Sequence, residues 1–158
     1  MGSSALIGLG SNLGDRRANL NGAITALGEV PGVTFRRVSS SHETEPVGGP
    51  PGQGKYLNAV ALIETGLDPL ALLHVLEKIE ARFGRERKVR WGARTLDLDL
   101  LVFDDRIIEM PELELPHPRM RTRRFVLEPL VEVAPEAVDP LTGRSFAAIL
   151  ADLKSGSG

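Results

Sequence analysis

Two aspartates alternate with leucines near the middle of the chain, in the stretch TLDLDLLVF. In a strand, side chains two residues apart share a face, so Asp97 and Asp99 point one way while Leu96, Leu98 and Leu100 point the other way, into the core. Two ionised carboxylates roughly 7 Å apart would repel each other by about 2 kcal/mol at an effective dielectric constant near 20. A positive charge should therefore lie between them. Mg²⁺ fits, because it takes oxygen ligands and uses one or two carboxylates together with water and substrate phosphates.

A basic segment precedes the aspartates. Its cations are Arg85, Arg87, Lys88, Arg90 and Arg94, and Glu86 is its single acid. These are more cations than two aspartates could neutralise, which predicts a polyanionic ligand, and the planar arginine side chain suits phosphate oxygens. Beside a carboxylate pair, such a segment is typical of a metal-nucleotide site. On the pattern of the two aspartates alone, a structural ion pair with Arg94 or another neighbour is equally favoured.

A second basic cluster follows in PHPRMRTRRF, with the same phosphate-binding composition. Its members are His117, Arg119, Arg121, Arg123 and Arg124. A lone histidine is more often a structural side chain than a ligand. The chain has no Walker-type loop, no dinucleotide GxGxxG, no HExxH and no cysteine, and GLGSNLG reads as a tight turn into a helix. Ser39, Ser40 and Ser41 have no identifiable histidine partner for nucleophilic catalysis.

Hydrophobic periodicity and turn residues predict the elements that must position these side chains. We expect strands at 5–10, 33–41, 56–65, 95–103 and 107–108, and helices at 16–27 and 68–83. This order indicates an α+β fold with a ferredoxin-like βαββαβ core, a mainly antiparallel sheet and helices packed on it. The proline-rich C-terminal third should be largely irregular, apart from helices near 125–132 and 146–153.

The composition bounds the class of protein. A chain of 158 residues that is 42% hydrophobic fits a single catalytic domain over 1–158, and we expect 1–4 and 154–158 to be linker residues. A net charge of -2 does not indicate a nucleic-acid or membrane partner. No apolar run approaches the ~20 residues that span a bilayer. We expect a cytoplasmic monomer.

Several motifs, in the same order along the chain, resemble those of one family. They are GLGSNLGD at 8–15, the S-x-x-x-T-x-P-x-G run at 40–48, YLNAV at 56–60, IEARFGR at 79–85, RWGARTLDLDLL at 90–101 and LPHPRMRTRRFVLEPL at 115–130. The chain resembles the 6-hydroxymethyl-7,8-dihydropterin pyrophosphokinases of folate biosynthesis. The resemblance implies transfer of the terminal diphosphate of ATP to the hydroxymethyl group of the pterin, giving AMP and the pterin diphosphate.

The same resemblance implies roles for individual residues. Asp97 and Asp99 would bind two Mg²⁺ ions and, with Arg85 and Arg94, form the catalytic set. The nucleotide, ATP as co-substrate, would be bound by Arg87, Arg90, Trp91, Arg94, Leu100, His117 and Arg123. The pterin would lie between the rings of Tyr56 and Phe125, with its polar edge read by Asn58 and the backbone around Thr44 and Val47. Two positions depart from the family pattern: Ala93 stands where proline is frequent, and His42 where tyrosine is common.

Two other classes of function remain open on the sequence. One is a non-catalytic sensor that binds Mg-ATP. The other is a ferredoxin-like RNA-binding module that uses Trp91 and the basic segment. The RNA-binding interpretation is disfavoured because the expected aromatic pair on a strand is absent and the net charge is negative.

Overall fold

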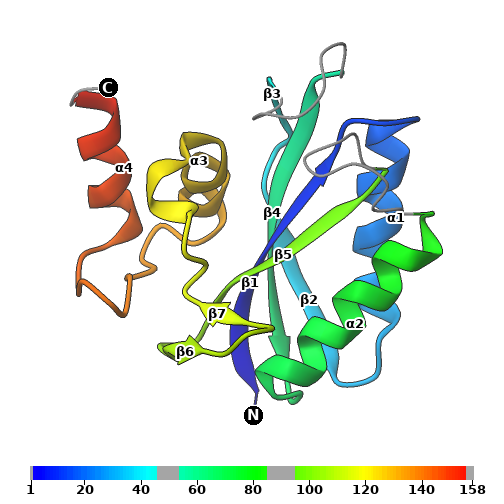
Figure 1. The fold of residues 1–158 in the computed structure, drawn as a ribbon, viewed down its shortest axis with the longest axis horizontal. Coiled ribbons are helices and arrows are strands. Elements are labelled where there is room, and N and C mark those ends of the chain that lie inside the picture. The colour runs from blue at the N-terminus through cyan, green and yellow to red at the C-terminus, as the bar shows by residue number, and fades with distance from the viewer. Residues whose placement is uncertain (1, 46–53, 85–94, 156–158) are drawn as a thin grey trace.

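The fold is built around one antiparallel sheet (Figure 1). The computed structural model describes residues 2–45, 54–84 and 95–155. The strands are β1 (Ser3–Ser11), β2 (Val33–Val38), β3 (His42–Thr44), β4 (Tyr56–Thr65) and β5 (Asp97–Phe103). The order across the sheet is β2-β4-β1-β5, with β3 paired to β4, and every pairing is antiparallel. The predicted α+β, ferredoxin-like class is confirmed.

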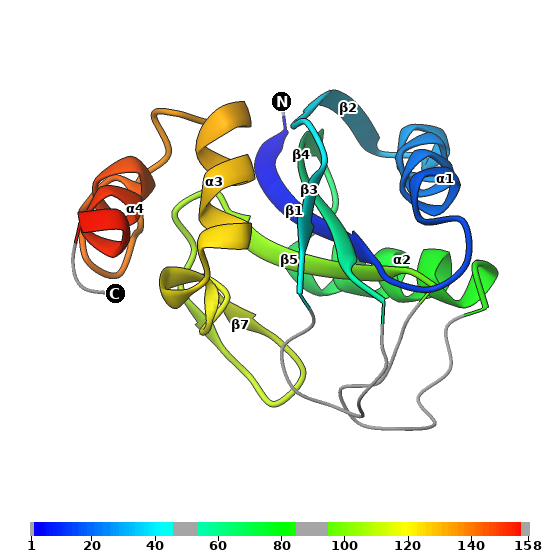
Figure 2. The same ribbon diagram turned by 90° about the horizontal axis from the view of Figure 1, so that it is seen from above.

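Helices α1 (Arg16–Glu29) and α2 (Pro69–Arg82) cover one face of the sheet (Figure 2). Each begins at an aspartate cap: Asp15 accepts a hydrogen bond from the Ala18 amide, and Asp68 accepts one from the Ala71 amide. Both helices send aliphatic side chains onto the sheet. The core on this face includes Ile7, Leu9, Leu20, Leu27, Ile63, Leu72, Leu76, Leu98 and Leu100. Packing of α1, α2 and this core on one face keeps the sheet rigid and leaves the opposite face for other elements.

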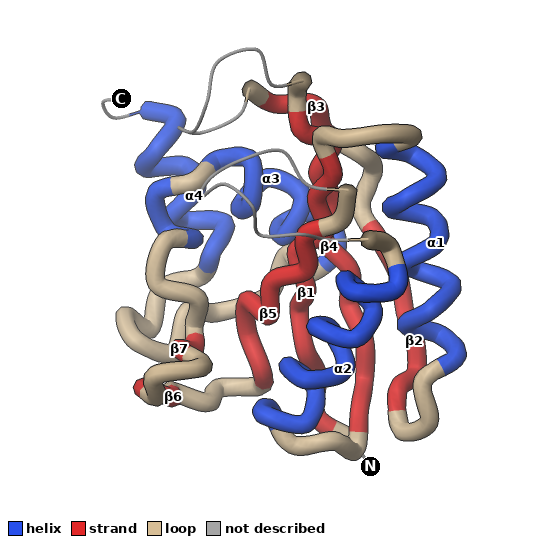
Figure 3. The backbone as a smooth tube through the Cα atoms, turned by 45° about the vertical axis from the view of Figure 1, so that its right-hand side comes forward, coloured by secondary structure: helices blue, strands red, loops and turns tan. Residues whose placement is uncertain are grey.

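Helix α3 (Arg124–Val133) packs on the opposite face, and α4 (Phe146–Ser155) packs on the outer side of α3 (Figure 2). Both helices were expected from the sequence. The second core lies beneath them and includes Leu6, Val60, Leu101, Met120, Leu127, Leu130 and Phe146. The predicted short strand at 107–108 begins only at Ile108, because β6 (Ile108–Glu109) pairs with β7 (Glu114–Leu115) in a small sheet beside β5 (Figure 3). Neither β7 nor the 3-10 turn η1 (Met120–Thr122) was predicted.

The strand predicted at 33–41 ends earlier, because β2 stops at Val38 and a separate strand, β3, begins at His42. Val38 pairs with Ala61 and His42 with Asn58, so residues 39–41 lie opposite only residues 59–60. Ser39 stabilises this interruption, because its amide donates to the Val60 carbonyl and its Oγ accepts from the Val60 amide, each at 2.9 Å. A hydroxyl thus replaces a backbone carbonyl in the ladder, so the prediction that the strand continues to residue 41 was wrong, and β3 was not predicted.

Described residues near both ends of the chain belong to regular elements. Ser3 and Ser4 belong to β1, where they pair with Thr65 and Glu64. Lys154 belongs to α4, and its Nζ lies 3.6 Å from Glu128 Oε2 on α3. These residues are therefore parts of the fold. Within the described ranges, no helix is long and apolar enough to cross a membrane.

Candidate active site

Two glycines on the central strand create a pocket on the α3 face of the sheet. Gly10 on β1 is in register with Asn58 on β4 and with Asp97 on β5. Gly8 is likewise in register with Val60 and Asp99. Neither glycine has a side chain to fill the space between its two neighbours. The central strand therefore forms a shallow floor, and the flanking strands provide the walls.

Gly10 is closely approached by the wall residues. A Cβ at this position would lie 3.2 Å from Asn58 Oδ1 and 3.4 Å from Cδ1 of Tyr56. Gly8 and Gly10 were not predicted as site residues, because GLGSNLG was interpreted as a tight turn into a helix. Glycines two residues apart in an otherwise apolar strand are the signal that could have identified them.

The pocket brings together many of the side chains expected to bind ligands. It is lined by Thr44, Tyr56, Asn58 and Phe125 of the predicted pterin set, and by Asp97, Asp99 and Arg123 of the predicted metal and nucleotide sets. Asn58 Nδ2 donates to Thr44 Oγ1 at 2.7 Å, which joins β3 to β4 at the wall. The Arg123 guanidinium lies 5.5 Å from the centroid of the Phe125 ring. The pocket therefore combines an aromatic, polar side with a charged side.

The two aspartates lie on the pocket face of β5, and both are half-buried. Leu98 and Leu100 are buried on the other face, so the predicted alternation is confirmed. The backbone between the aspartates is also held in place, because the Leu98 amide donates to the buried Glu80 Oε2 on α2 at 2.7 Å. This contact fixes β5 where its carboxylates face the pocket.

A second cavity adjoins the first at Asp99. It is lined by Leu98, Asp99, Leu100, Glu114 and His117 together with residues of the β6–β7 connection. Asp99 lines both cavities, so ligands bound in the two cavities would both lie next to this residue. Two of the predicted nucleotide residues, Leu100 and His117, lie in this second cavity.

His117 is held in its neutral form. Its amide donates to the Leu101 carbonyl at 2.8 Å, and its Nδ1 accepts from the Arg119 amide at 3.2 Å. Burial, and then the nearby charges of Arg123 and Arg119, lower the pKa of His117 to about 4, and Asp97 partly opposes them. The ring is therefore uncharged near neutral pH, with its hydrogen on Nε2.

The structure separates the second basic cluster into two groups. Arg121 pairs with the fully buried Asp139 through two contacts, Nε to Oδ2 at 2.6 Å and Nη2 to Oδ1 at 2.9 Å. Arg124 pairs with Glu128 one turn along α3. Arg123 instead lines the first cavity, where burial and then Arg119 lower its pKa while Asp99 and Asp97 raise it. His117 and Arg123 are thus the members of this cluster that line the two cavities.

Several predicted site residues lie outside the described residues. They are Val47, Arg85, Arg87, Arg90, Trp91 and Arg94.

The carboxylates of Asp97 and Asp99 suit magnesium. In the described part of the chain, no group of three or more His, Cys, Asp or Glu side chains could hold a metal ion by itself. Mg²⁺ does not need such a cage, because it retains water and takes phosphate oxygens as ligands alongside one or two carboxylates. The donor set fits an ion that is delivered with a phosphate-bearing ligand.

Comparison with known proteins decides the family. The model of the 7,8-dihydro-6-hydroxymethylpterin-pyrophosphokinase family matches residues 6–135. The chain belongs to this family. The resemblance seen in the motifs is thereby confirmed, and the pyrophosphokinase family is favoured over a nucleotide sensor or an RNA-binding module.

Two pyrophosphokinase relatives are similar over most of their length. A 2-amino-4-hydroxy-6-hydroxymethyldihydropteridine pyrophosphokinase of Synechocystis is 43% identical over 146 residues, which cover 92% of this chain and 74% of the relative. The protein of the same name from Bacillus subtilis is 47% identical over 133 residues, covering 84% of this chain and 79% of the relative.

A solved structure has a fold similar to that of this chain. The crystal structure of Plasmodium falciparum HPPK-DHPS with pteroate has a TM-score of 0.75 and 16% sequence identity to this chain. The match covers 96% of this chain and 42% of the Plasmodium chain, so this chain spans less than half of that protein.

Proposed function

We propose that this protein transfers diphosphate from ATP to 6-hydroxymethyl-7,8-dihydropterin, giving AMP and the pterin diphosphate, in folate biosynthesis. The observation that carries the proposal, beside family membership, is the pair of cavities that meet at Asp99. A diphosphotransferase needs two substrate sites whose ligands meet at a charged junction. In the reaction, the hydroxymethyl oxygen bonds to the β-phosphorus, the bond between that phosphorus and the α-phosphate oxygen breaks, and the hydroxyl proton is released.

The pterin is assigned to the first cavity. Tyr56 and Phe125 supply two aromatic rings for a planar heterocycle, and Asn58 and Thr44 supply polar atoms for its edge. Val47, which lies outside the described residues, completes the proposed pterin set. Gly8 and Gly10 also line this cavity, where a side chain at Gly10 would crowd Asn58 and Tyr56.

The nucleotide is assigned to the second cavity. Leu100 supplies apolar surface, and neutral His117 can donate a hydrogen bond from Nε2. Arg123 lies on the side of the first cavity next to Asp97 and Asp99, where its charge faces the phosphates. Arg87, Arg90 and Trp91 complete the proposed nucleotide set from the undescribed segment.

Asp97 and Asp99 would hold the magnesium, for which we propose two ions. When bound, Mg²⁺ would neutralise phosphate charge and polarise the phosphoryl oxygens. Arg85 and Arg94 would stabilise the transferring diphosphate, with Arg123 adding positive charge at the junction. No side chain is assigned as a general base, because phosphoryl transfer can depend mainly on positioning and charge stabilisation.

A coupled assay for AMP tests the proposed reaction. The protein is incubated with ATP, Mg²⁺ and the pterin, and each component is omitted in turn. We expect AMP only when all three are present. Mg-ATP binding without AMP formation would identify a sensor instead, and formation of ADP would contradict diphosphate transfer. The cytoplasmic location and the monomeric state remain predictions. Gel filtration can test the monomeric state.

A further inference from the structure

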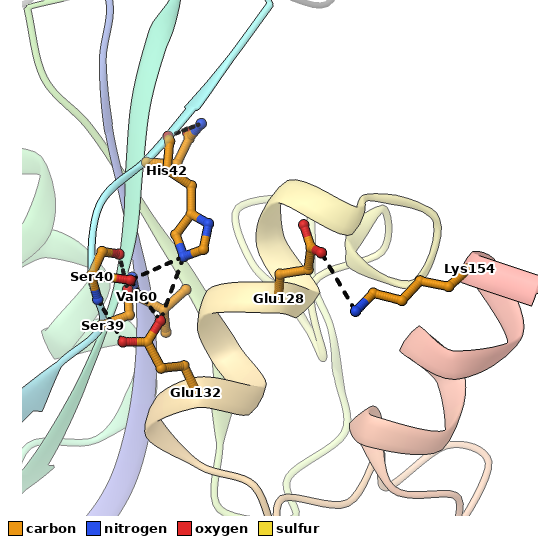
Figure 4. A network of polar contacts seen from close by, with 8 residues as sticks. Ser39, Ser40, His42, Val60, Glu128, Glu132 and Lys154 are labelled. Atoms are coloured by element: carbon orange, nitrogen blue, oxygen red, sulfur yellow. Dashed lines mark hydrogen bonds and ion pairs between the residues drawn. The ribbon is translucent and has the colours of Figure 1, made fainter.

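Two glutamates of helix α3, Glu128 and Glu132, point in different directions and contact different neighbours (Figure 4). Glu132 reaches the sheet: its Oε2 accepts from the Ser40 amide at 2.7 Å, and its Oε1 accepts from Ser40 Oγ at 2.9 Å and lies 3.5 Å from His42 Nε2. Glu128 instead points towards α4, where its Oε2 lies 3.6 Å from Lys154 Nζ. The two carboxylates therefore join the same helix to different neighbours.

The Glu132 contact leads to one wall of the first cavity. Ser40 lies in the interruption between β2 and β3, and His42 begins β3 in register with Asn58. Thr44, at the end of β3, accepts the 2.7 Å hydrogen bond from the Asn58 side chain. The positions of Ser40 and His42 therefore determine the positions of Thr44 and Asn58 in the β3–β4 wall of the first cavity.

The same helix carries the opposite wall. Phe125 lies seven residues before Glu132 on α3. This spacing is roughly two turns, so both side chains project from the same side of the helix. A contact at Glu132 therefore fixes the spacing between Phe125 on α3 and the β3–β4 wall.

The geometry excludes a catalytic triad at this cluster. Ser40 Oγ lies 3.3 Å from His42 Nε2, and Glu132 Oε1 faces that same nitrogen. A triad requires the acid to orient the histidine through its other ring nitrogen. The hydrogen bond from the Ser40 amide lowers the pKa of Glu132 most, with further lowering by the Ser40 hydroxyl and His42. An ionised carboxylate held by a backbone amide is a structural clamp rather than a proton carrier.

We propose that Glu132 is a positioning residue for the pterin half of the site. It acts through Ser40 and His42 and does not line either cavity itself. The inference rests on the proposed function, because it takes the first cavity as the pterin site. Replacing Glu132 with alanine should weaken pterin binding about tenfold and leave binding of Mg²⁺ with a non-hydrolysable ATP analogue unchanged.

Glu128→Ala is the matched control. It removes the same charge from the same helix, but its partners are Arg124 and Lys154, neither of which lines either cavity. Pterin affinity should stay within about twofold of the wild-type value. Glu132→Gln should retain most of the pterin affinity, since the amide oxygen can accept from the Ser40 amide and the NH₂ group can donate to Ser40 Oγ.

Calorimetric titration with pterin, at saturating Mg²⁺ and analogue, measures these differences, with thermal melting to check that each variant is folded. Wild-type protein that binds no pterin would overturn the proposed function. Wild-type protein that binds pterin, with Glu132→Ala binding it equally well, would overturn the inference alone. Equal weakening by Glu132→Ala and Glu128→Ala, or an equal loss of nucleotide affinity, would also overturn it.

A second variant keeps the test decisive if Glu132→Ala does not fold. Ser40→Ala removes the hydroxyl contact and keeps the backbone one, so pterin affinity should fall by about threefold. Where both single variants fold, the double variant should be no weaker than Glu132→Ala, because the two side chains contribute to one interaction. Full affinity in Ser40→Ala, or fully additive losses in the double variant, would contradict the proposal.

Discussion

The two faces of β5 show how one strand serves both stability and chemistry. Leu98 and Leu100 are buried beneath α2, whereas Asp97 and Asp99 face the pocket. The neighbouring β1 repeats the division, with Ile7 and Leu9 in the core and Gly8 and Gly10 on the pocket floor. Because the side-chain period of a strand is two, positions one residue apart meet different requirements. The core face can be rigid while the pocket face carries charges and open space that packing alone would not favour.

The largest expected effect is on the pocket face of β5. Asp97→Ala and Asp99→Ala should each lower turnover by several orders of magnitude, because the phosphate-bound metal loses a ligand. Thermal stability should be largely retained, since the relief of repulsion between the two carboxylates is offset by the loss of their attraction to Arg123. AMP formation and thermal melting check the pair of outcomes. Near-normal AMP formation by either variant would contradict the metal assignment.

The opposite face of the same strand should respond in the opposite way. Phe103→Ala removes a buried β5 side chain of the α2-side core and should lower the free energy of unfolding by about 4 kcal/mol, while the KM values of the folded enzyme stay near wild type. Phe103 lines neither cavity, so the variant tests packing only. Urea unfolding with steady-state kinetics at low temperature is the measurement. A large loss of turnover without a loss of stability would break the comparison between the faces.

The pocket floor should tolerate no side chain. In Gly10→Ala the new Cβ would crowd Asn58 Oδ1 and the Tyr56 ring, so pterin affinity should fall about tenfold while Mg-nucleotide affinity is kept. Gly28→Ala in α1 is the control, because a Cβ there meets nothing within 4 Å. That control should raise stability by about 0.5–1 kcal/mol through helix propensity. Titration with each ligand separates the two cavities, and unchanged pterin binding in Gly10→Ala would argue against the glycine floor.

The smallest expected effect is on the pH dependence of stability, through His117 in the second cavity. The pKa of His117 is lowered from 6.5 to about 4 in the folded protein. The unfolded chain therefore takes up this proton first, so ligand-free stability should fall as pH decreases from 6.5 to 4. His117→Gln should reduce that dependence, measured as the difference between wild-type and variant urea midpoints across this pH range. Parallel profiles for the two proteins would show that His117 does not titrate abnormally.

Local patterns were sufficient to predict most of the fold and the direction of the key carboxylates. Period-two alternation placed Asp97 and Asp99 on one face, and hydrophobic periodicity predicted helices at 16–27 and 68–83, close to the observed α1 and α2. The interruption at Ser39 was not predictable in the same way, since it depends on hydrogen bonds to Val60 across the sheet.

Other features of the site depend on partners that only the folded chain brings together. The composition of the second basic cluster could not show that Arg121 pairs with Asp139 while Arg123 lines a cavity, because Asp139 lies beyond α3. The pocket floor likewise follows from the register of Gly10 with Asn58 and Asp97, which is set by pairing of three strands.

The central claim is that the carboxylates of β5 bind a metal delivered with a triphosphate. Calorimetric titration of a non-hydrolysable ATP analogue into wild type and Asp97→Ala, each with Mg²⁺ and with a chelator, tests it most directly. We expect Mg²⁺ to tighten binding to wild type at least about tenfold and to have little effect on the variant. Equal metal dependence in both proteins would show that the magnesium does not bind at these carboxylates.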